Sequence, residues 1–437
     1  SFPSEDALTF FSMQLFLICY SSVILFLIIL KLKDIYNINF SIIFLISLFF
    51  IPSFSGHMLF NVKDIPHLLN MFLAKLYIYD YLADNSKKLS IFKIVFLGFI
   101  TAASLSIRIN ALVFLFFFIT ITFIFSKNKI IFFQNIIKVI FFSFMFLYVM
   151  TPQSWQNPID WLLQSLQFQS SFNWGGHTLT NGKFILSSDT SNSYLFTWFF
   201  YKMPLFIHIS FIYFLYKFIK SKKLFNFTTY SLLFIVVNFA LYPIIKPPAY
   251  DGLRHFLFLI PFFVILFTEV VNEIRDKKII ISALILYGVF TQFGLEQYKY
   301  TYFNEFVDLK EVSYRCEFID GCGNWPTDYW SFSGKETADY LNQNFENENI
   351  VICRPSQSFK NYIELEKFNT FTEIDNLPVY KYFLVITSHR PRLNQDSCYF
   401  LINNVNYVCS EEFTLKKRYR FQSVNLGYLN KCYVKYG

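Results

Sequence analysis

The sequence predicts a polytopic α-helical membrane protein of about ten spans, followed by an extracytoplasmic α+β domain. Of its 437 residues, 54% are hydrophobic and only 16% are charged, a balance that excludes an ordinary soluble globular protein. Apolar runs recur up to residue 295, and the composition then becomes polar and rich in cysteine. Disorder, a coiled coil and collagen are excluded, because the chain has 60 Phe residues and neither charged heptads nor a Gly-X-Y period.

Nine apolar runs are long enough, or nearly so, to cross a hydrocarbon layer of about 30 Å. They cover residues 8–30, 39–51, 91–107, 110–126, 130–150, 196–219, 227–245, 254–271 and 279–295. A tenth run, 66–83, begins at a proline, which is favoured in a first helical turn, but it carries Lys75 and Asp80. It is therefore either a buried spanning helix or a helix at the membrane interface.

Basic residues set the orientation of these spans, because they gather in cytoplasmic loops. They occur as Lys31 with Lys33, Lys87 with Lys88, Lys127 with Lys129, Lys220 with Lys222 and Lys223, and Arg275 with Lys277 and Lys278. The intervening loops 52–66, 151–193 and 246–253 are poor in positive charge and should face outward. Ser1 and the residues after 295 then lie on the outer side of the membrane.

Two domains follow from this pattern, a transmembrane domain over 1–295 and an extracytoplasmic α+β domain over 296–437. In the second, helical spacing predicts a helix at about 334–345, a strand at 350–353, and further apolar stretches at 379–387 and 398–409. Its six cysteines are Cys316, Cys322, Cys353, Cys398, Cys409 and Cys432. We expect up to three disulfides of undetermined pairing in an oxidising compartment; reduced buried cysteines or a metal site are the alternatives.

The first outward loop, 52–66, places His57, Asn61, Lys63 and Asp64 beside the membrane. A carboxylate there can accept a proton from a hydroxyl group, and Lys63 can pair with a phosphate. The alternative is a solvated loop with an exposed ion pair between Lys63 and Asp64.

Cations also stand at the outward ends of two later spans. Arg254 and His255 precede an apolar run, and Arg108 lies between two spans. An arginine at that depth is costly unless it meets an anion such as a lipid phosphate or a carboxylate. The alternative is that Arg254 snorkels to the lipid headgroups.

Two further segments are candidates for an acceptor or sugar groove. Trp155 and Asn157 lie in the long outward loop, where Trp, Asn and Gly together suit sugar stacking, although interfacial anchoring is the better explanation of any single Trp. Asp328 lies in an aromatic cluster that can instead be the seam between a soluble domain and its membrane part. The sequence has no P-loop and no GxSxG, HExxH or GxGxxG motif.

Taken in order, these segments resemble the GT-C type of bacterial integral-membrane glycosyltransferases, the relatives of the dolichyl-phosphate-mannose protein mannosyltransferases and lipid A aminoarabinose transferases. The resemblance covers residues 56–330. Its motifs are Gly56-His57, Asn61, Lys63-Asp64-Ile65-Pro66, Pro152, Trp155, Asn157-Pro158, Asp251-Gly252, Arg254-His255, Tyr302-Phe303-Asn304 and Asp328-Tyr329-Trp330.

The resemblance implies transfer of one sugar from a polyprenyl-phosphate carrier to a glycan, lipid or protein acceptor at the outer face of the membrane. Arg254, His255, Lys63 and Arg108 would hold the departing phosphate, and Asp64 is the candidate base. Relatives carry a catalytic acidic residue after a first transmembrane helix, so we expect another helix and that residue upstream of Ser1.

We expect no cofactor, with a divalent metal as the alternative, and no nucleic-acid partner. A transporter or flippase of a lipid-linked sugar is the alternative function. Transporters place ionisable residues near the midplane and show repeated halves, whereas here the charges gather at the outer mouth.

Overall fold

The computed structural model describes residues 5–83, 89–170, 177–220, 226–274, 277–309, 312, 325–326, 328, 330–353, 357–371, 382–388 and 407–434. The chain forms two compact units. The first comprises Ser1–Trp174, Ser191–Pro248 and Leu253–Leu286, and the second comprises Gly175–Thr190, Ala249–Gly252 and Tyr287–Gly437.

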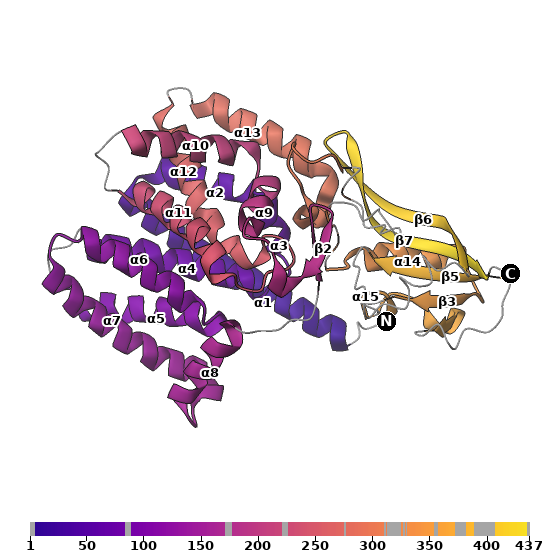
Figure 1. Ribbon diagram of the computed structural model, residues 1–437, viewed down its shortest axis with the longest axis horizontal. Coiled ribbons are helices and arrows are strands. Elements are labelled where there is room, and N and C mark those ends of the chain that lie inside the picture. The colour runs from indigo at the N-terminus through magenta and orange to yellow at the C-terminus, as the bar shows by residue number, and fades with distance from the viewer. Residues whose placement is uncertain are drawn as a thin grey trace. The chain divides into compact units, whose positions relative to one another are not determined.

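The first unit consists of helices (Figure 1). They are α1 (Glu5–Ile35), α2 (Ile38–Phe49), α3 (Pro52–His57), α4 (Asp64–Ile78), the π-helix η1 (Tyr79–Ala83), α5 (Ile91–Ile107), α6 (Ala111–Phe125), α7 (Lys129–Met150), η2 (Pro152–Ser154), α8 (Pro158–Ser170), α9 (Tyr194–Lys202), α10 (Leu205–Lys220), α11 (Phe227–Ile245), η4 (Arg254–Leu259) and α12 (Ile260–Glu273). Helix α13 (Lys277–Gln292) runs from this unit into the second.

Five helical segments in the described part of the chain are long and apolar enough to cross a membrane. They are Phe11–Ile35, Lys129–Met150, Phe227–Ile245, Arg254–Glu273 and Lys278–Thr301. The shorter helices α2, α5 and α6 are also apolar. The protein is therefore a multi-pass membrane protein, although the count of about ten spans is not confirmed.

Two of the expected spans differ from the structure for local reasons. The run 196–219 is divided into α9 and α10 at Pro204, because proline lacks an N–H donor and its ring clashes with the preceding helical turn. The run 66–83 forms α4 and η1, and almost every residue of α4 is buried. This helix packs against α1, α5, α6 and η4, so it is the buried centre of the helical unit.

Asparagine side chains begin three of the helices. Asn37, Asn128 and Asn226 precede α2, α7 and α11, and each accepts a hydrogen bond from the backbone N–H three residues later. Basic residues come shortly before each cap in the sequence, and those before Asn37 lie at the end of α1. The Asn caps and the basic residues, which favour the cytoplasmic side, therefore lie near the same ends of these helices.

The second unit contains an antiparallel pair of strands and a five-stranded mixed sheet. The pair is β1 (His177–Thr180) with β2 (Lys183–Leu186), and the sheet has the order β4-β3-β5-β7-β6. Its strands are β3 (Asn349–Ile352), β4 (Asn369–Phe371), β5 (Phe383–Ser388), β6 (Tyr407–Tyr419) and β7 (Gln422–Val434). Strand β3 is parallel to β4 and β5, while β7 is antiparallel to β5 and β6.

Short helices complete this unit: η3 (Ser187–Asp189), η5 (Phe293–Thr301), α14 (Ser333–Asn344), α15 (Gln357–Lys360) and η7 (Leu365–Lys367). Ala338 and Leu341 of α14 pack on Ile350, Leu384 and Leu429 of the sheet. The predicted helix at 334–345 and strand at 350–353 are thus confirmed as α14 and β3. Strand β5 lies in the predicted apolar stretch 379–387, and most of the stretch 398–409 lies outside the described residues.

The predicted disulfide chemistry is present in the second unit. Cys409 and Cys432 stand opposite one another on β6 and β7 and form a disulfide. Cys353 is also disulfide-bonded. The remaining predicted cysteines of this unit, Cys316, Cys322 and Cys398, lie outside the described residues.

Gly98 sets the close approach of α5 to α7. A Cβ atom at this position would lie 2.7 Å from Cβ of Phe142 and 3.2 Å from its backbone carbon. We expect Gly98→Leu to destabilise the helical unit by about 1–3 kcal/mol, because the helices cannot separate without losing contacts. Thermal unfolding in detergent measures the effect, and Phe92→Leu, at an α5 side chain that is 82% exposed, is the control. An unchanged midpoint for Gly98→Leu would contradict this packing.

Candidate functional site

Asp64 is the buried centre of a polar cluster in the helical unit. It is the first residue of α4 and is 3% exposed. Asn61 holds it from the preceding turn: its Oδ1 accepts from the Asp64 backbone N–H at 2.9 Å, and its Nδ2 donates to Oδ2 at 2.9 Å. A carboxylate at a helix N-terminus is also stabilised by the helix dipole. These local contacts, all within four residues of the sequence, fix the position of the carboxylate.

Two arginines from distant parts of the sequence converge on this carboxylate. Arg108 follows the last residue of α5, and its Nη2 donates to Oδ1 of Asp64. Arg254 opens η4, and its Nε donates to Oδ2 of Asp64 at 2.9 Å. The side chains of Arg108 and Arg254 are only 11% and 15% exposed. One buried carboxylate is therefore shared by two guanidinium groups.

The arginines determine the protonation state of Asp64. Burial alone would raise the pKa of its carboxyl group, but Arg108 and Arg254 outweigh burial and hold that pKa well below its usual range. Asp64 is therefore ionised throughout the physiological pH range. A carboxylate with so low a pKa binds a proton weakly, so it holds cations well and serves poorly as a general base.

Arg108 keeps donor capacity beyond its ion pair. A guanidinium group has five N–H donors, and the Nε of Arg108 is buried with no hydrogen-bond partner among the described residues. A buried, unsatisfied donor on a cation is costly unless an anion or a water molecule reaches it. The arrangement can therefore accept an anion next to Asp64.

The other predicted cations and imidazoles surround the same carboxylate. Lys63, immediately before Asp64, is exposed, whereas His255 interacts electrostatically with Asp64, Arg108 and Lys63. His57 is 6% exposed at the end of α3, and its Nδ1 lies 3.4 Å from Nδ2 of Asn61. Burial lowers the pKa of His57 to about 3, so its ring is neutral at pH 7.

The structure thus gathers seven of the predicted residues in one place: His57, Asn61, Lys63, Asp64, Arg108, Arg254 and His255. The alternatives of a solvated Lys63–Asp64 pair and of a snorkelling Arg254 do not describe this arrangement. Asp64 is instead buried and bonded to Arg254.

Trp155 and Asn157 make local contacts at the end of α7 and the start of α8. Nε1 of Trp155 donates to the carbonyl oxygen of Tyr148 at 2.7 Å, and its ring is 54% exposed. The amide of Asn157 contacts the side chain and backbone N–H of Asp160, in the first turn of α8. These bonds anchor the loop to its own helices.

Asp328 belongs to the second unit and is completely buried. Burial raises the pKa of its carboxyl group, against hydrogen bonds from Ser333 and Tyr300. It accepts from the backbone N–H groups of Phe332 and Ser333, at 3.1 and 2.9 Å, and from the hydroxyl groups of Ser333 and Tyr300. These bonds satisfy the first turn of α14, which is a structural task.

His67 is a polar residue of the cluster that sequence reasoning missed. It is 3% exposed on α4, interacts electrostatically with Asp64 and Arg108, and packs edge-on against Phe258 at 6.2 Å between ring centroids. Its spacing of three residues from Asp64 would have placed both on one helical face. In the described part of the chain, no group of three or more His, Cys, Asp or Glu side chains is placed to hold a metal ion.

The structure is similar to two crystal structures of ArnT from Cupriavidus metallidurans, one in the apo state and one bound to undecaprenyl phosphate. The sequence identities are 9% and 8%, and the TM-scores are 0.45 and 0.44. Each match covers 95% of this chain and 83% of the ArnT chain. No protein-family model and no curated protein matches the sequence.

At such low identity the similarity concerns the fold alone.

The low pKa of His57 predicts a pH-dependent stability. Its unfolded pKa is about 6.5, so between pH 6.5 and 3 the unfolded state binds a proton that the folded state does not. The stabilisation is complete above pH 6.5 and is lost as the pH falls, by up to about 1.4 kcal/mol per pH unit.

Thermal unfolding of the purified protein measures this, with His57→Gln as the matched variant. We expect the wild type to lose more stability than the variant from pH 7.5 to 5.5, while above pH 7 the difference between them stays constant. Parallel curves over the whole range would show that the ring is protonated in the folded state.

Proposed function

We propose that the protein is a membrane glycosyltransferase that transfers a sugar from a polyprenyl-phosphate carrier to an acceptor hydroxyl group at the outer face of the membrane. The observation that carries the proposal is the cluster of Arg108, Asp64 and Arg254, buried among apolar helices. The order of motifs along residues 56–330 supports the same activity. The sugar and the acceptor are left general.

A lipid phosphate fits the chemistry of this cluster. Guanidinium groups bind phosphate oxygens in a planar, often bidentate geometry, and a buried site strengthens such a bond because water does not screen it. Arg108 has a buried Nε donor that no described residue accepts. The apolar helices around the site suit the polyprenyl chain, which a soluble sugar phosphate would lack.

Within this proposal, Asp64 is a positioning residue rather than the general base. It holds Arg108 and Arg254 in place through both carboxylate oxygens, and its low pKa makes it a weak proton acceptor. The arginines in turn stabilise the negative charge that develops on the departing phosphate. Lys63, exposed beside them, adds positive charge on the open side of the cluster.

The proposal also gives roles to residues outside the arginine cluster. Trp155 presents an exposed ring that can stack on a sugar, and Asn157 is exposed beside it. Asp328 is buried and accepts hydrogen bonds within its own unit, so its role in the proposal is to hold the start of α14. The Cys409–Cys432 disulfide supports an extracytoplasmic second unit in an oxidising compartment.

Purified protein in liposomes, supplied with a labelled polyprenyl-phosphate sugar, tests the activity. Release of the sugar from the lipid, to an acceptor or to water, is the expected result. Movement of the intact lipid between leaflets without cleavage would identify a flippase. If the sugar is not released and the lipid does not move between leaflets, the proposal is overturned.

Arg254→Ala should weaken binding of the polyprenyl-phosphate sugar by about 10- to 100-fold, because a hydrogen bond to a charged group contributes about 1.5–3 kcal/mol. Arg254→Lys keeps the charge but loses the planar fork, so its affinity should be intermediate. Lys183→Ala, at an exposed lysine of β2, is the control. Equal affinities for the wild type and Arg254→Ala would show that Arg254 has no part in donor binding.

A further inference from the structure

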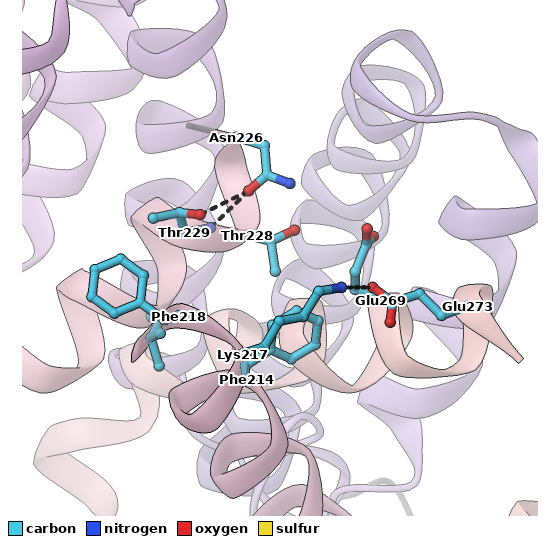
Figure 2. Close-up of a pocket in the computed structure, with 9 residues that line it drawn as sticks. Phe214, Lys217, Phe218, Asn226, Thr228, Thr229, Glu269 and Glu273 are labelled. Atoms are coloured by element: carbon cyan, nitrogen blue, oxygen red, sulfur yellow. Dashed lines mark hydrogen bonds and ion pairs between the residues drawn. The ribbon is translucent and has the colours of Figure 1, made fainter. Parts of the chain in front are cut away.

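A cavity of about 120 Å³ opens between three helices of the first unit (Figure 2). It is bounded by the end of α10, the beginning of α11 and the end of α12. Polar lining residues include Lys217, Thr228, Glu269 and Glu273. The cavity therefore combines both signs of charge with hydroxyl groups.

This cavity lies far from the arginine cluster. Arg254 begins the apolar segment Arg254–Glu273, whereas Glu269 and Glu273 stand at its other end. The six residues of η4 rise by about 2 Å each and those of α12 by about 1.5 Å each, so the two ends are about 30 Å apart. That separation matches the thickness of the hydrocarbon layer, so the two sites face opposite leaflets.

One carboxylate of the cavity is already engaged. Oε1 of Glu273 accepts from Nζ of Lys217, and its Oε2 accepts from the hydroxyl group of Tyr213 at 2.7 Å. In Figure 2 the Lys217–Glu273 pair lies beside Glu269. The charge of Glu273 is thus matched by a cation of the chain itself.

Glu269 is different, because its Oε2 is buried without a hydrogen-bond partner among the described residues. A buried carboxylate oxygen of this kind requires a donor, and a cationic donor is the most favourable. Thr228, across the cavity on α11, adds a hydroxyl group whose Oγ1 lies 3.0 Å from the hydroxyl oxygen of Tyr36. The cavity therefore suits a group that carries N–H donors and a positive charge.

The volume limits the size of that group. About 10–15 Å³ of such volume holds one water molecule, so 120 Å³ admits a group of roughly ten atoms heavier than hydrogen. An aminoethyl group with its ester oxygen fits, and size alone does not exclude a trimethylated amine. The N–H donors of the ammonium group, rather than its size, therefore distinguish the two headgroups.

We propose that this cavity binds the primary-ammonium headgroup of an aminoethyl phospholipid from the leaflet opposite the arginine cluster. The ammonium group donates to Glu269, and the lipid phosphate stays at the mouth, where Lys217 and Lys220 occupy the last turn of α10. The acyl chains follow the apolar helix surface. The site is independent of the glycosyltransferase proposal, and its loss leaves that proposal standing.

Native mass spectrometry of the full-length protein tests the proposal with three probes: phosphatidylethanolamine, phosphatidylcholine of identical acyl chains, and free O-phosphoethanolamine. We expect phosphatidylethanolamine to bind about tenfold or more tightly than phosphatidylcholine, because a quaternary amine has no N–H donor for Glu269. Tight binding of free phosphoethanolamine would show that the cavity binds the ammonium group of a soluble amine rather than that of a lipid. Equal retention of the two lipids overturns the proposal.

Glu269→Gln keeps the shape of the side chain and removes its charge. We expect this variant to lose the preference for phosphatidylethanolamine, with the two lipids within about twofold of each other. Glu366→Gln, at an exposed carboxylate of η7 in the second unit, should retain the full preference. A Glu269→Gln variant that still prefers phosphatidylethanolamine tenfold would overturn the proposal, and the wild-type comparison stands even if the variant does not fold.

Discussion

The ion pairs of Asp64 with Arg108 and Arg254 are the interaction on which the functional part of the helical unit depends. They join the start of α4, the end of α5 and the start of η4, segments that the sequence separates by up to 190 residues. Removing one partner from a buried pair costs about 3–5 kcal/mol, because the remaining charge is stranded. The cluster therefore fixes the start of α4, the end of α5 and the start of η4 relative to one another. It also determines which anion can bind between them.

The central position of α4 explains why such a cluster persists at a membrane surface. This helix packs against α1, α5, α6 and η4, so the carboxylate at its first residue is shielded from water. Shielding strengthens each bond to Asp64 and raises the cost of leaving any donor unsatisfied. The same logic applies at the far end of α12, where a buried oxygen of Glu269 requires a donor.

Much of this architecture is visible in the sequence, but the partnerships are not. Hydropathy and charge identified Asp64 and Arg254 at outward ends of apolar runs, yet only the fold shows that Arg108 shares the same carboxylate. His67 was missed because a histidine in an apolar run gives no signal without the helical phase of Asp64. Asp328 accepts hydrogen bonds at the start of α14, and the sequence around it does not distinguish such a carboxylate from one in a groove. Pro204 divides one predicted span into two helices.

The central claim is that the arginine cluster recognises the phosphate of a lipid. The most direct test compares the affinity of the purified full-length protein for a polyprenyl phosphate and for the uncharged polyprenol of equal chain length, in the same detergent at low salt. We expect the phosphate to bind at least about tenfold more tightly, since each charge-assisted bond contributes about 1.5–3 kcal/mol. Equal affinities for the two lipids would contradict it.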